Sequence, residues 1–357
     1  MKYYIQEVYK AKTDQKTAGI KARDDVEEIL ESLSYRPIVI SSIIKDRKDL
    51  KKLKKVLIHK ETYDIWKKTL SFLKSEDELI VQFPIKEHSI FLSHLFKIIQ
   101  NRNIKVSLII HDLELLRTAK RQSISRSQRL RLKIEEENML KICSKIIVHN
   151  EKMKNFVSSL GIDKNKLISL EIFDYLIDDL KKEQLKKNQK DLPIIIAGNL
   201  RIHKAKYAYH LPDNYNFNLY GVDYEGVIND KIKYHGSFSP NALPYAMEGS
   251  FGLVWDGESA TTCNGVYGEY LKINNPHKTS LYLSLGIPVI IWKQAALADF
   301  ICENKCGIVI DSLYDIKDKL DKMTEKEYNE LLENTQKVSE KLLNGYYTKK
   351  AIALTLK

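Results

Sequence analysis

Short, uninterrupted apolar runs recur along this chain, and segments with helical periodicity separate them. In the first half the runs are ELIVQFP, IKVSLIIHD and KIIVHN, and in the second half they are LPIIIAG, FGLVWDG and IPVIIW. A strand that is apolar on both faces has to be covered on both, which happens in parallel sheets flanked by crossover helices. This feature predicts an α/β fold of the doubly wound kind.

A charged stretch divides the pattern into two halves. The segment DDLKKEQLKKNQKD, residues 178–191, has only two large apolar residues, and the alternation of strands and helices restarts after it. A chain of 357 residues is also longer than one hydrophobic core usually serves. We therefore predict two Rossmann-like domains that face a central cleft. The predicted parts are an N-terminal domain at 1–180, a linker at 181–192, a C-terminal domain at 193–335 and a C-terminal helix at 336–357, which could pack back on the N-terminal domain.

Composition and missing motifs narrow the classes of function. The N-terminus has no apolar stretch of the signal-peptide kind, and no run of about 18 apolar residues occurs. The four cysteines lack the spacing of a metal site, so we expect a reduced, cytoplasmic protein. No Gly-x-Ser-x-Gly, His-Glu-x-x-His, P-loop or Asp-x-Asp pattern is present, which disfavours hydrolases, zinc proteases, kinases and metal-dependent sugar transferases of another fold. The spaced glycines of a nicotinamide or flavin site are absent as well.

The positive charge is confined to the first half of the chain. Lys and Arg number 40 against 27 Asp and Glu in residues 1–190, and 18 against 20 in residues 191–357. Residues 117–133, RTAKRQSISRSQRLRLK, contain seven basic side chains and no acid. Such a segment suggests an anionic partner, which could be phospholipid head groups, a pyrophosphate-linked acceptor or nucleic acid, although a solvated helix face explains it equally well. No helix-turn-helix or aromatic-interleaved pattern supports nucleic-acid binding.

The stretch LKINNPHKTSLYLSLG predicts an anion site at the start of a helix. A helix that begins near Pro276 presents unpaired backbone N–H groups, and Asn275 comes directly before it. Lys278 in the first turn opposes the helix dipole, and a bound diphosphate would remove that conflict. The alternative is that Lys278 points into solvent.

A second basic cluster follows the first strand of the predicted C-terminal domain. In IIIAGNLRIHKAKY, a turn at Asn199 is followed by Arg201 and Lys204. Because this cluster also lies at a strand end, both clusters can converge on one diphosphate. Four further sites are predicted to contact the donor: Thr17 and Gly19 in KTAGIKA, where an N-cap by Thr17 is the alternative, Tyr220 in NFNLYG, and Asp256 with Gly257 in LVWDG.

A carboxylate and an imidazole follow a buried strand of the predicted N-terminal domain. His111 and Asp112 end the run IKVSLIIHD. Asp112 could act as general base on an acceptor hydroxyl, and His111 could do the same or orient it. The alternative is that Asp112 caps the next helix.

These segments resemble a known family. GSFSPNALPYAMEGSFGLVWDG and GVYGEYLKINNPHKTSLYLSLGIPVIIWKQAALADFICENKCGIVI are similar to a bacterial family of GT-B glycosyltransferases. The family includes β-1,6-galactofuranosyltransferases of polysaccharide assembly and glucosyltransferases that extend glycans on serine-rich adhesins. TAGIKA, LIIHDLELLR, IIVHN and EIFDYL extend the resemblance over nearly the whole chain.

The resemblance implies the transfer of a hexose from a UDP-sugar to a glycan hydroxyl, without metal or other cofactor. It places the nucleotide on the C-terminal domain and a glycan acceptor, which could be lipid-linked, on the N-terminal domain. Homo-oligomers are also implied, and the basic segment 117–133 could bring the protein to the inner face of the cell membrane. The Glu-x7-Glu pair of many GT-B enzymes is absent here. Two alternatives stay open, a UDP-sugar epimerase and a non-catalytic partner subunit of a glycosyltransferase complex.

Overall fold

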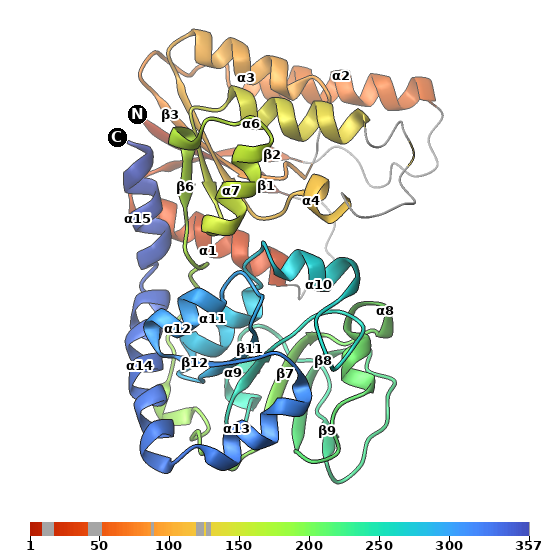
Figure 1. The fold of residues 1–357 in the computed structure, drawn as a ribbon. Helices are drawn as coiled ribbons and strands as arrows, with labels where there is room; N and C mark the ends of the chain where they lie inside the picture. Colours follow the sequence, from red (N-terminus) through yellow and green to blue (C-terminus); the bar gives the residue numbers. More distant parts are fainter. Residues whose placement is uncertain (9–17, 42–51, 87–88, 119–124, 126–129, 357) are drawn as a thin grey trace. The chain divides into compact units, whose positions relative to one another are not determined.

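The structure, a computed structural model, describes residues 1–8, 18–41, 52–86, 89–118, 125 and 130–356. The chain forms two compact units, each built around its own sheet (Figure 1). The first unit contains Met1–Gln15, Val26–Leu170 and Lys349–Lys357, and the second contains Lys16–Asp25 and Glu171–Thr348.

The first unit has a six-stranded parallel sheet with the strand order β2-β1-β3-β4-β5-β6. Its central strands are buried on both faces, because Leu79 and Leu108 on one face, and Ile80 and Ile109 on the other, are at most 2% exposed. This burial explains the uninterrupted apolar runs. The strands are β1 (Lys2–Val8), β2 (Arg36–Ser41), β3 (Glu78–Phe83), β4 (Lys105–Ile110), β5 (Lys145–Val148) and β6 (Leu167–Ser169).

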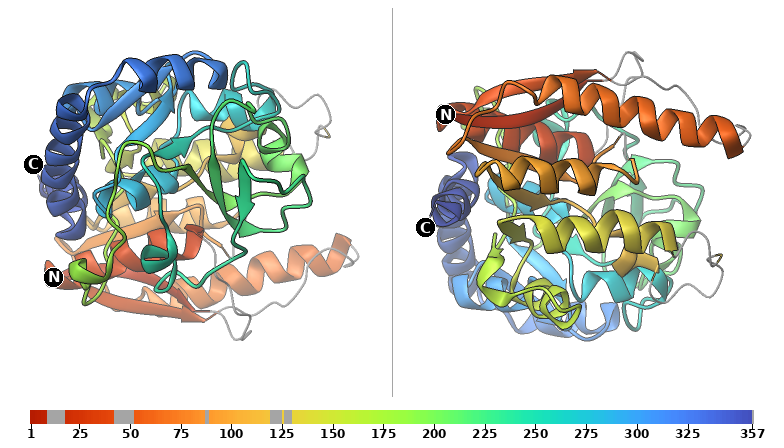
Figure 2. Two further views of the ribbon diagram at one scale, coloured as in Figure 1. Left: turned by 90° about the horizontal axis from the view of Figure 1, so that it is seen from below. Right: turned by 90° about the horizontal axis from the view of Figure 1, so that it is seen from above.

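Helices cover both faces of this sheet. Because connections between parallel strands are right-handed, the direction in which a connection crosses the sheet determines which face its helix covers. Helices α2, α3 and α6 follow neighbouring connections, and they lie side by side (Figure 2). The connection from β1 to β2 runs in the opposite direction across the sheet, so α1 belongs to the other face. The helical segments are α1 (Ala18–Ser32), α2 (Lys52–Thr69), α3 (Leu92–Asn101), α4 (Glu114–Thr118), the π-helical turn η1 (Lys133–Glu137), α6 (Asn138–Ile142), α7 (Glu151–Ser159) and η2 (Lys164–Lys166).

The second unit has another six-stranded parallel sheet, with the order β12-β11-β10-β7-β8-β9. The chain runs from β7 outwards to β9, and then returns to build β10 to β12 on the other side of β7. This reversal defines the switch point of the sheet. The strands are β7 (Ile194–Asn199), β8 (Phe217–Val222), β9 (Ile232–Tyr234), β10 (Gly252–Val254), β11 (Val289–Trp292) and β12 (Gly307–Ile310).

The helix that begins after Pro276 packs against the long helix α14. Pro276 occupies the N-cap of that helix, as the sequence predicts. A reciprocal capping box of Thr324 and Glu327 starts α14. The helical segments of this unit are η3 (Lys182–Gln184), α8 (Ile202–Ala205), η4 (Lys206–Tyr209), α9 (Leu243–Ala246), α10 (Gly265–Leu271), α11 (His277–Ser284), α12 (Ala298–Asn304), η5 (Leu313–Asp315), α13 (Ile316–Lys322) and α14 (Glu325–Leu343). The last helix, α15 (Tyr346–Thr355), begins in this unit, and its residues from Lys349 onwards group with the first unit.

The two Rossmann-like sheets confirm the predicted fold class, whereas the unit boundaries differ from the predicted ones. The division after β6 falls at residue 170 rather than 180, and residues 16–25 group with the second unit. Residues 349–357, the end of the predicted C-terminal helix, group with the first unit. In the described part of the chain, no helix combines the length and the apolarity that a membrane crossing requires.

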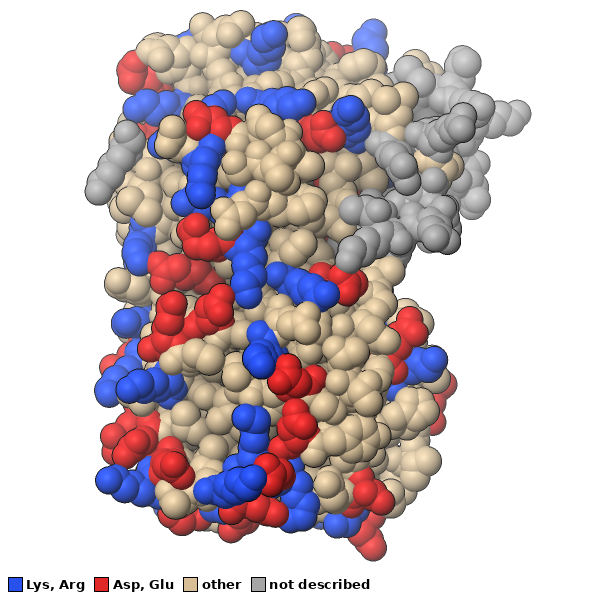
Figure 3. Space-filling model, in the orientation of Figure 1, with Lys and Arg blue, Asp and Glu red and all other residues tan. Residues whose placement is uncertain are grey.

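Most of the basic segment 117–133 lies outside the described residues. On the face shown in Figure 3, Lys and Arg side chains of the described surface are interspersed with Asp and Glu. The described residues of this face therefore form no large area of a single sign, and the case for an anionic partner rests on the sequence of the segment itself.

Candidate functional site

The predicted donor residues of the second unit gather at the switch point of its sheet. Asn199 ends β7, and Arg201 and Lys204 follow it at the start of α8. Asp256 and Gly257 follow β10, the strand next to β7. In open α/β sheets, ligands bind at such a switch point, outside the carboxyl ends of the strands. Two separate stretches of sequence therefore meet at one edge.

Lys278 is held at this edge by the chain itself. Its ammonium donates to the Asp256 carboxylate (Nζ–Oδ1 2.9 Å) and to the Trp255 carbonyl oxygen (2.7 Å). The side chains of Lys278 and Asp256 are 16% and 19% exposed, so the alternative of a solvated lysine does not hold. Asp256 offsets the conflict with the α11 dipole, and the third N–H of the ammonium can still take another acceptor.

Gly257 has a conformation that only glycine adopts easily. Its φ is +115°, and a Cβ atom would lie 2.4 Å from the carbonyl oxygen of Asn264. The loop that follows is fastened by its own hydrogen bonds, from the Glu258 N–H to the Asn264 side chain (2.9 Å) and from Trp255 Nε1 to the Ser259 carbonyl (2.9 Å). Trp255 is fully buried. Its indole ring is therefore not exposed for stacking on a ligand.

Arg201 forms the outer part of the same edge. Its guanidinium donates to the Asp223 carboxylate (Nε–Oδ2 2.6 Å), and both side chains are about half exposed. The Asn199 side chain accepts the Arg201 N–H (3.1 Å) and closes the turn that follows β7. Lys204 Nζ lies 5.8 Å from the ring centroid of Tyr267 on α10. This arrangement keeps two cationic side chains at the end of β7.

Two predicted donor residues lie beneath the surface. Tyr220 is 1% exposed, its ring stacks on His235 (centroids 4.6 Å apart), and its hydroxyl accepts the Glu248 N–H. Asn275 is 4% exposed, and its Nδ2 donates to the carbonyl oxygen of Glu171 (3.0 Å). The structure thus gives both side chains structural partners, and Tyr220 offers no ring face to a ligand.

Sequence reasoning missed a buried cluster beside the start of α11. The imidazole of His277 lies 5.0 Å from the Tyr175 ring, between centroids, and Lys21 lies above that same ring. Burial, and then the charge of Lys21, lowers the pKa of His277 to about 3, so the ring is neutral at physiological pH. Lys21 is paired with Asp25, which is 2% exposed. The sequence does point to this region, because Lys21 belongs to the KTAGIKA stretch (residues 16–22) from which two donor contacts are predicted. Gly19 of that stretch lies in the first turn of α1.

Polar side chains also cross the carboxyl ends of the strands in the first unit. Gln6 on β1 and Gln82 on β3 both donate to Glu27 of α1, over 2.8 and 3.1 Å. The other end of the Gln82 amide, Oε1, lies 2.7 Å from Nε2 of His111, which follows β4. His111 is therefore part of a hydrogen-bonded row that reaches across three adjacent strands.

Asp112 lies next to two titratable groups. Burial lowers the pKa of His149 to about 4, although the Asp112 charge opposes this effect. Glu136 accepts the backbone N–H groups of Glu114 (3.0 Å) and Leu115 (2.9 Å) at the start of α4. Glu136 therefore carries out at least part of the capping that the alternative interpretation gave to Asp112.

The pKa of Glu136 is raised to about 7, first by burial and then by the negative charges of Glu114 and Asp112. Its two backbone hydrogen bonds act in the opposite direction. This carboxyl group, which is 4% exposed, lies in the π-helical turn η1. It titrates close to neutral pH beside the predicted catalytic pair.

Comparison with known proteins identifies the family. A family model described as "Glucosyltransferase 3-like, N-terminal domain" matches residues 2–172, and its C-terminal counterpart matches residues 194–355. The β-1,6-galactofuranosyltransferase WbbI of Escherichia coli (strain K12) is 37% identical over 282 residues, 77% of this chain and 78% of that protein. The chain belongs to the glucosyltransferase 3-like family.

Other relatives agree with this membership. Glucosyltransferase 3 of Streptococcus gordonii is 28% identical over 210 residues, which are 58% of this chain and 60% of that protein. Among solved structures, Anabaena HepE in complex with UDP aligns with 100% of this chain and 99% of its own, with a TM-score of 0.57 and 10% identity. The likeness to HepE shows that the present chain has the GT-B fold.

Thr17 and most of the segment 117–133 lie outside the described residues, so their predicted roles stay predictions. Where the structure describes the chain, no group of three or more His, Cys, Asp or Glu side chains is arranged to hold a metal ion. Transfer without a metal also stays a prediction.

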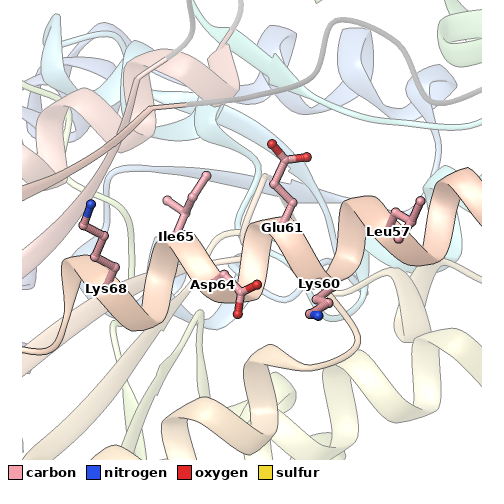
Figure 4. A pocket seen from close by; sticks show the side chains of 6 residues that line it. All are labelled: Leu57, Lys60, Glu61, Asp64, Ile65 and Lys68. Atoms are coloured by element: carbon pink, nitrogen blue, oxygen red, sulfur yellow. The ribbon is translucent and has the colours of Figure 1, made fainter.

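A surface hollow of the first unit contains none of the predicted site residues. It is lined by the single helix α2, from which Leu57, Glu61 and Ile65 point to one side (Figure 4). An i, i+4 spacing produces such a row on any helix. We give this hollow no role in the chemistry. Its full lining is Leu57, Lys60, Glu61, Asp64, Ile65 and Lys68.

Proposed function

We propose that this family member transfers a hexose from a UDP-sugar to a hydroxyl group of a glycan acceptor. The observation that supports the proposal is that Arg201 and Lys204 follow β7, while Lys278 bonds to Trp255 and Asp256, which follow the neighbouring strand β10. Three cations and a helix start at one strand edge suit a diphosphate. The named activities of WbbI and of glucosyltransferase 3, both sugar transfers, support the same reaction class.

In the proposed reaction, the acceptor oxygen bonds to the anomeric carbon as the bond from that carbon to the β-phosphate oxygen breaks. UDP leaves with an additional negative charge, and the α11 start together with Lys278 stabilises that charge. The third N–H of Lys278 is the donor that the chain leaves for the phosphate, because Asp256 and Trp255 accept the other two. We propose that no metal takes part and that the anomeric configuration inverts.

We assign the acceptor proton to the His111 and Asp112 pair at the end of β4. A base has to remove the hydroxyl proton as the new bond forms, and both side chains are partly exposed. The neighbouring His149 is neutral at physiological pH because burial lowers its pKa to about 4, so it adds no positive charge beside Asp112.

The finer parts of the proposal rest on the relatives and on the sequence. Galactofuranose is the first donor sugar to test, because WbbI is more similar to this chain than glucosyltransferase 3 is. We propose a cytoplasmic enzyme that reaches the inner face of the membrane through residues 117–133, with a glycan acceptor that could be lipid-linked. A homo-oligomer is proposed from the resemblance alone.

The test is UDP release from a panel of UDP-sugars, galactofuranose and glucose included, with and without candidate glycan acceptors. We expect release that depends on an acceptor. Lys278→Ala should lower this turnover by about 100-fold, the usual loss when one donor to a developing oxyanion is removed. The matched control is Lys322→Ala, because Lys322 pairs with Asp318 (2.8 Å) on the exposed surface of α13 in the same unit.

Two results would contradict the proposal. Turnover of the UDP-sugar to an isomer without an acceptor would mean an epimerase. Undiminished transfer by Lys278→Ala, with Lys322→Ala equally active, would remove the diphosphate site from the second unit.

A further inference from the structure

The row of side chains that ends at His111 determines which nitrogen of that imidazole carries hydrogen. A neutral imidazole has one N–H and one lone pair, and the choice between them follows from the partners of the ring. The two amides and the carboxylate of this row can be assigned in order, because a carboxylate only accepts hydrogen bonds.

Glu27 is the fixed point of the row. Its two carboxylate oxygens accept from Gln6 Nε2 (2.8 Å) and from Gln82 Nε2 (3.1 Å). An amide oxygen at either place would lie against a carboxylate oxygen, so each glutamine has to turn its NH2 group towards Glu27. Gln82 is 3% exposed between the sheet and α1, which leaves it little room to turn otherwise.

The orientation of Gln82 then determines the tautomer of His111. With its NH2 group on Glu27, Gln82 presents Oε1 to the imidazole, 2.7 Å from Nε2. An amide oxygen only accepts, so Nε2 of His111 has to carry a hydrogen. In the neutral ring the lone pair is therefore on Nδ1.

We propose that Glu27 and Gln82 are positioning residues that hold His111 in the Nε2–H tautomer, so that His111 exchanges protons at Nδ1. The inference rests on the proposed function for its catalytic meaning. When Nδ1 takes the acceptor proton, the ring becomes an imidazolium, and its Nε2–H stays bonded to Gln82. The Glu27 carboxylate, which is linked to the imidazole through Gln82, thus determines which nitrogen of His111 reacts.

Long-range ¹H–¹⁵N spectra of the histidine rings test this directly, at a pH where His111 is neutral. The His111 signals are assigned by their loss in His111→Gln. The wild-type ring should show a protonated Nε2 and an unprotonated Nδ1. An Nδ1–H tautomer in the wild type would overturn the proposal, whatever the activity of the enzyme.

Substitutions in the row separate positioning from structure. Glu27→Gln allows either end of the amide at position 27 to face Gln82, so His111 should show mixed tautomers. Transfer should slow by about tenfold with an unchanged KM for the UDP-sugar, a smaller loss than removal of a general base. The control is Glu31→Gln, the same change one turn along α1, where the carboxylate accepts from Tyr4 (2.7 Å). It should leave the tautomer unchanged.

A second variant keeps the test decisive if Glu27→Gln does not fold. Gln82→Leu removes the acceptor of Nε2 and leaves Glu27 bonded to Gln6, so His111 should lose its single tautomer and show a mixture. A single Nε2–H tautomer in Gln82→Leu, or an unchanged tautomer in a folded Glu27→Gln, would overturn the assignment. If no UDP-sugar is turned over but the spectra are as expected, the proposed function fails and the tautomer assignment stands.

Discussion

The carboxyl group of Glu136 caps the start of α4, and its protonation makes the stability of the first unit depend on pH. Its ionised form accepts two backbone N–H groups, whereas its protonated form can accept only with its remaining lone pairs. Burial and the nearby carboxylates nevertheless raise its pKa to about 7. The folded first unit therefore binds a proton here that the unfolded chain has already lost.

The sign of the pH dependence follows from this difference. Between the ordinary pKa of a glutamate, about 4.3, and about 7, the native state binds more protons, so the free energy of unfolding falls as pH rises. We expect a loss of about 4 kcal/mol across this window and no further loss from this group above it. Glu136→Gln should remove that decline. Urea unfolding at a series of pH values measures it.

The matched control is the neighbouring residue on the same turn. Glu137 faces Lys141 at 3.7 Å, so Glu137→Gln should leave the decline of the wild type in place. An equal decline in Glu136→Gln would show that another group titrates.

For single residues, the sequence predicted which part of the fold a residue belongs to better than it predicted where its side chain points and what it bonds to. Lys278 and Asp256 were both assigned to the donor site, but the sequence did not show that they bond to each other across 22 positions. Tyr220 lies on β8, which is buried on both faces, so strand periodicity could not show whether its ring reaches the surface. In the row from Glu27 to His111, directly bonded residues lie 55 positions apart (Glu27 and Gln82) and 29 positions apart (Gln82 and His111), so no local sequence pattern contains the row.

Among the elements, α14 supports the candidate site from outside. It has 19 residues and packs on α11, whose first turn carries Lys278. Its N-terminus depends on Thr324, which accepts the Glu327 N–H (3.2 Å), while Glu327 accepts the Thr324 N–H (2.8 Å). Loss of this cap exposes unsatisfied N–H groups and loosens the helix behind α11.

Thr324→Ala should therefore lower the free energy of unfolding by about 1 kcal/mol, the typical value of an N-cap. Thr324→Ser keeps the hydroxyl and should stay close to the wild type. Lys326→Ala, two positions along the same exposed turn, should change stability by less than about 0.5 kcal/mol. Urea unfolding of the three variants at one pH measures these differences, and equal midpoints for Thr324→Ala and Lys326→Ala would show that the cap contributes nothing.

The elements that the sequence predicted well are those with strong local signals. The strands at 79–83, 105–110 and 194–199 are apolar on both faces, and α11 begins after its proline. The segment HKAKYAYHL, expected as one helix, is divided into α8 and η4, where the Tyr207 N–H donates to the Gly257 carbonyl instead of continuing the helix. A tertiary contact overrides helix propensity there.

For the whole molecule, the separation of charge along the chain is the feature that the folded units do not explain. The first 190 residues carry an excess of 13 positive charges, 40 minus 27, and the rest carry an excess of 2 negative charges, 20 minus 18. Seven of the basic residues lie in 117–133. A net charge concentrated in this way acts on large anionic surfaces at distances of about a Debye length.

We therefore expect the protein to sediment with vesicles that contain anionic phospholipid and not with neutral ones. Replacing Arg121, Arg126 and Arg129 with glutamine should weaken this binding by about 100-fold at low salt, because each basic residue near such a surface contributes about 1 kcal/mol. The same number of substitutions in the second unit, at the exposed Lys319, Lys326 and Lys337, should have little effect, since the excess charge is not there. Binding should also weaken steeply as salt is raised. Equal losses in the two triple variants would mean that net charge alone, rather than the segment 117–133, attracts the membrane.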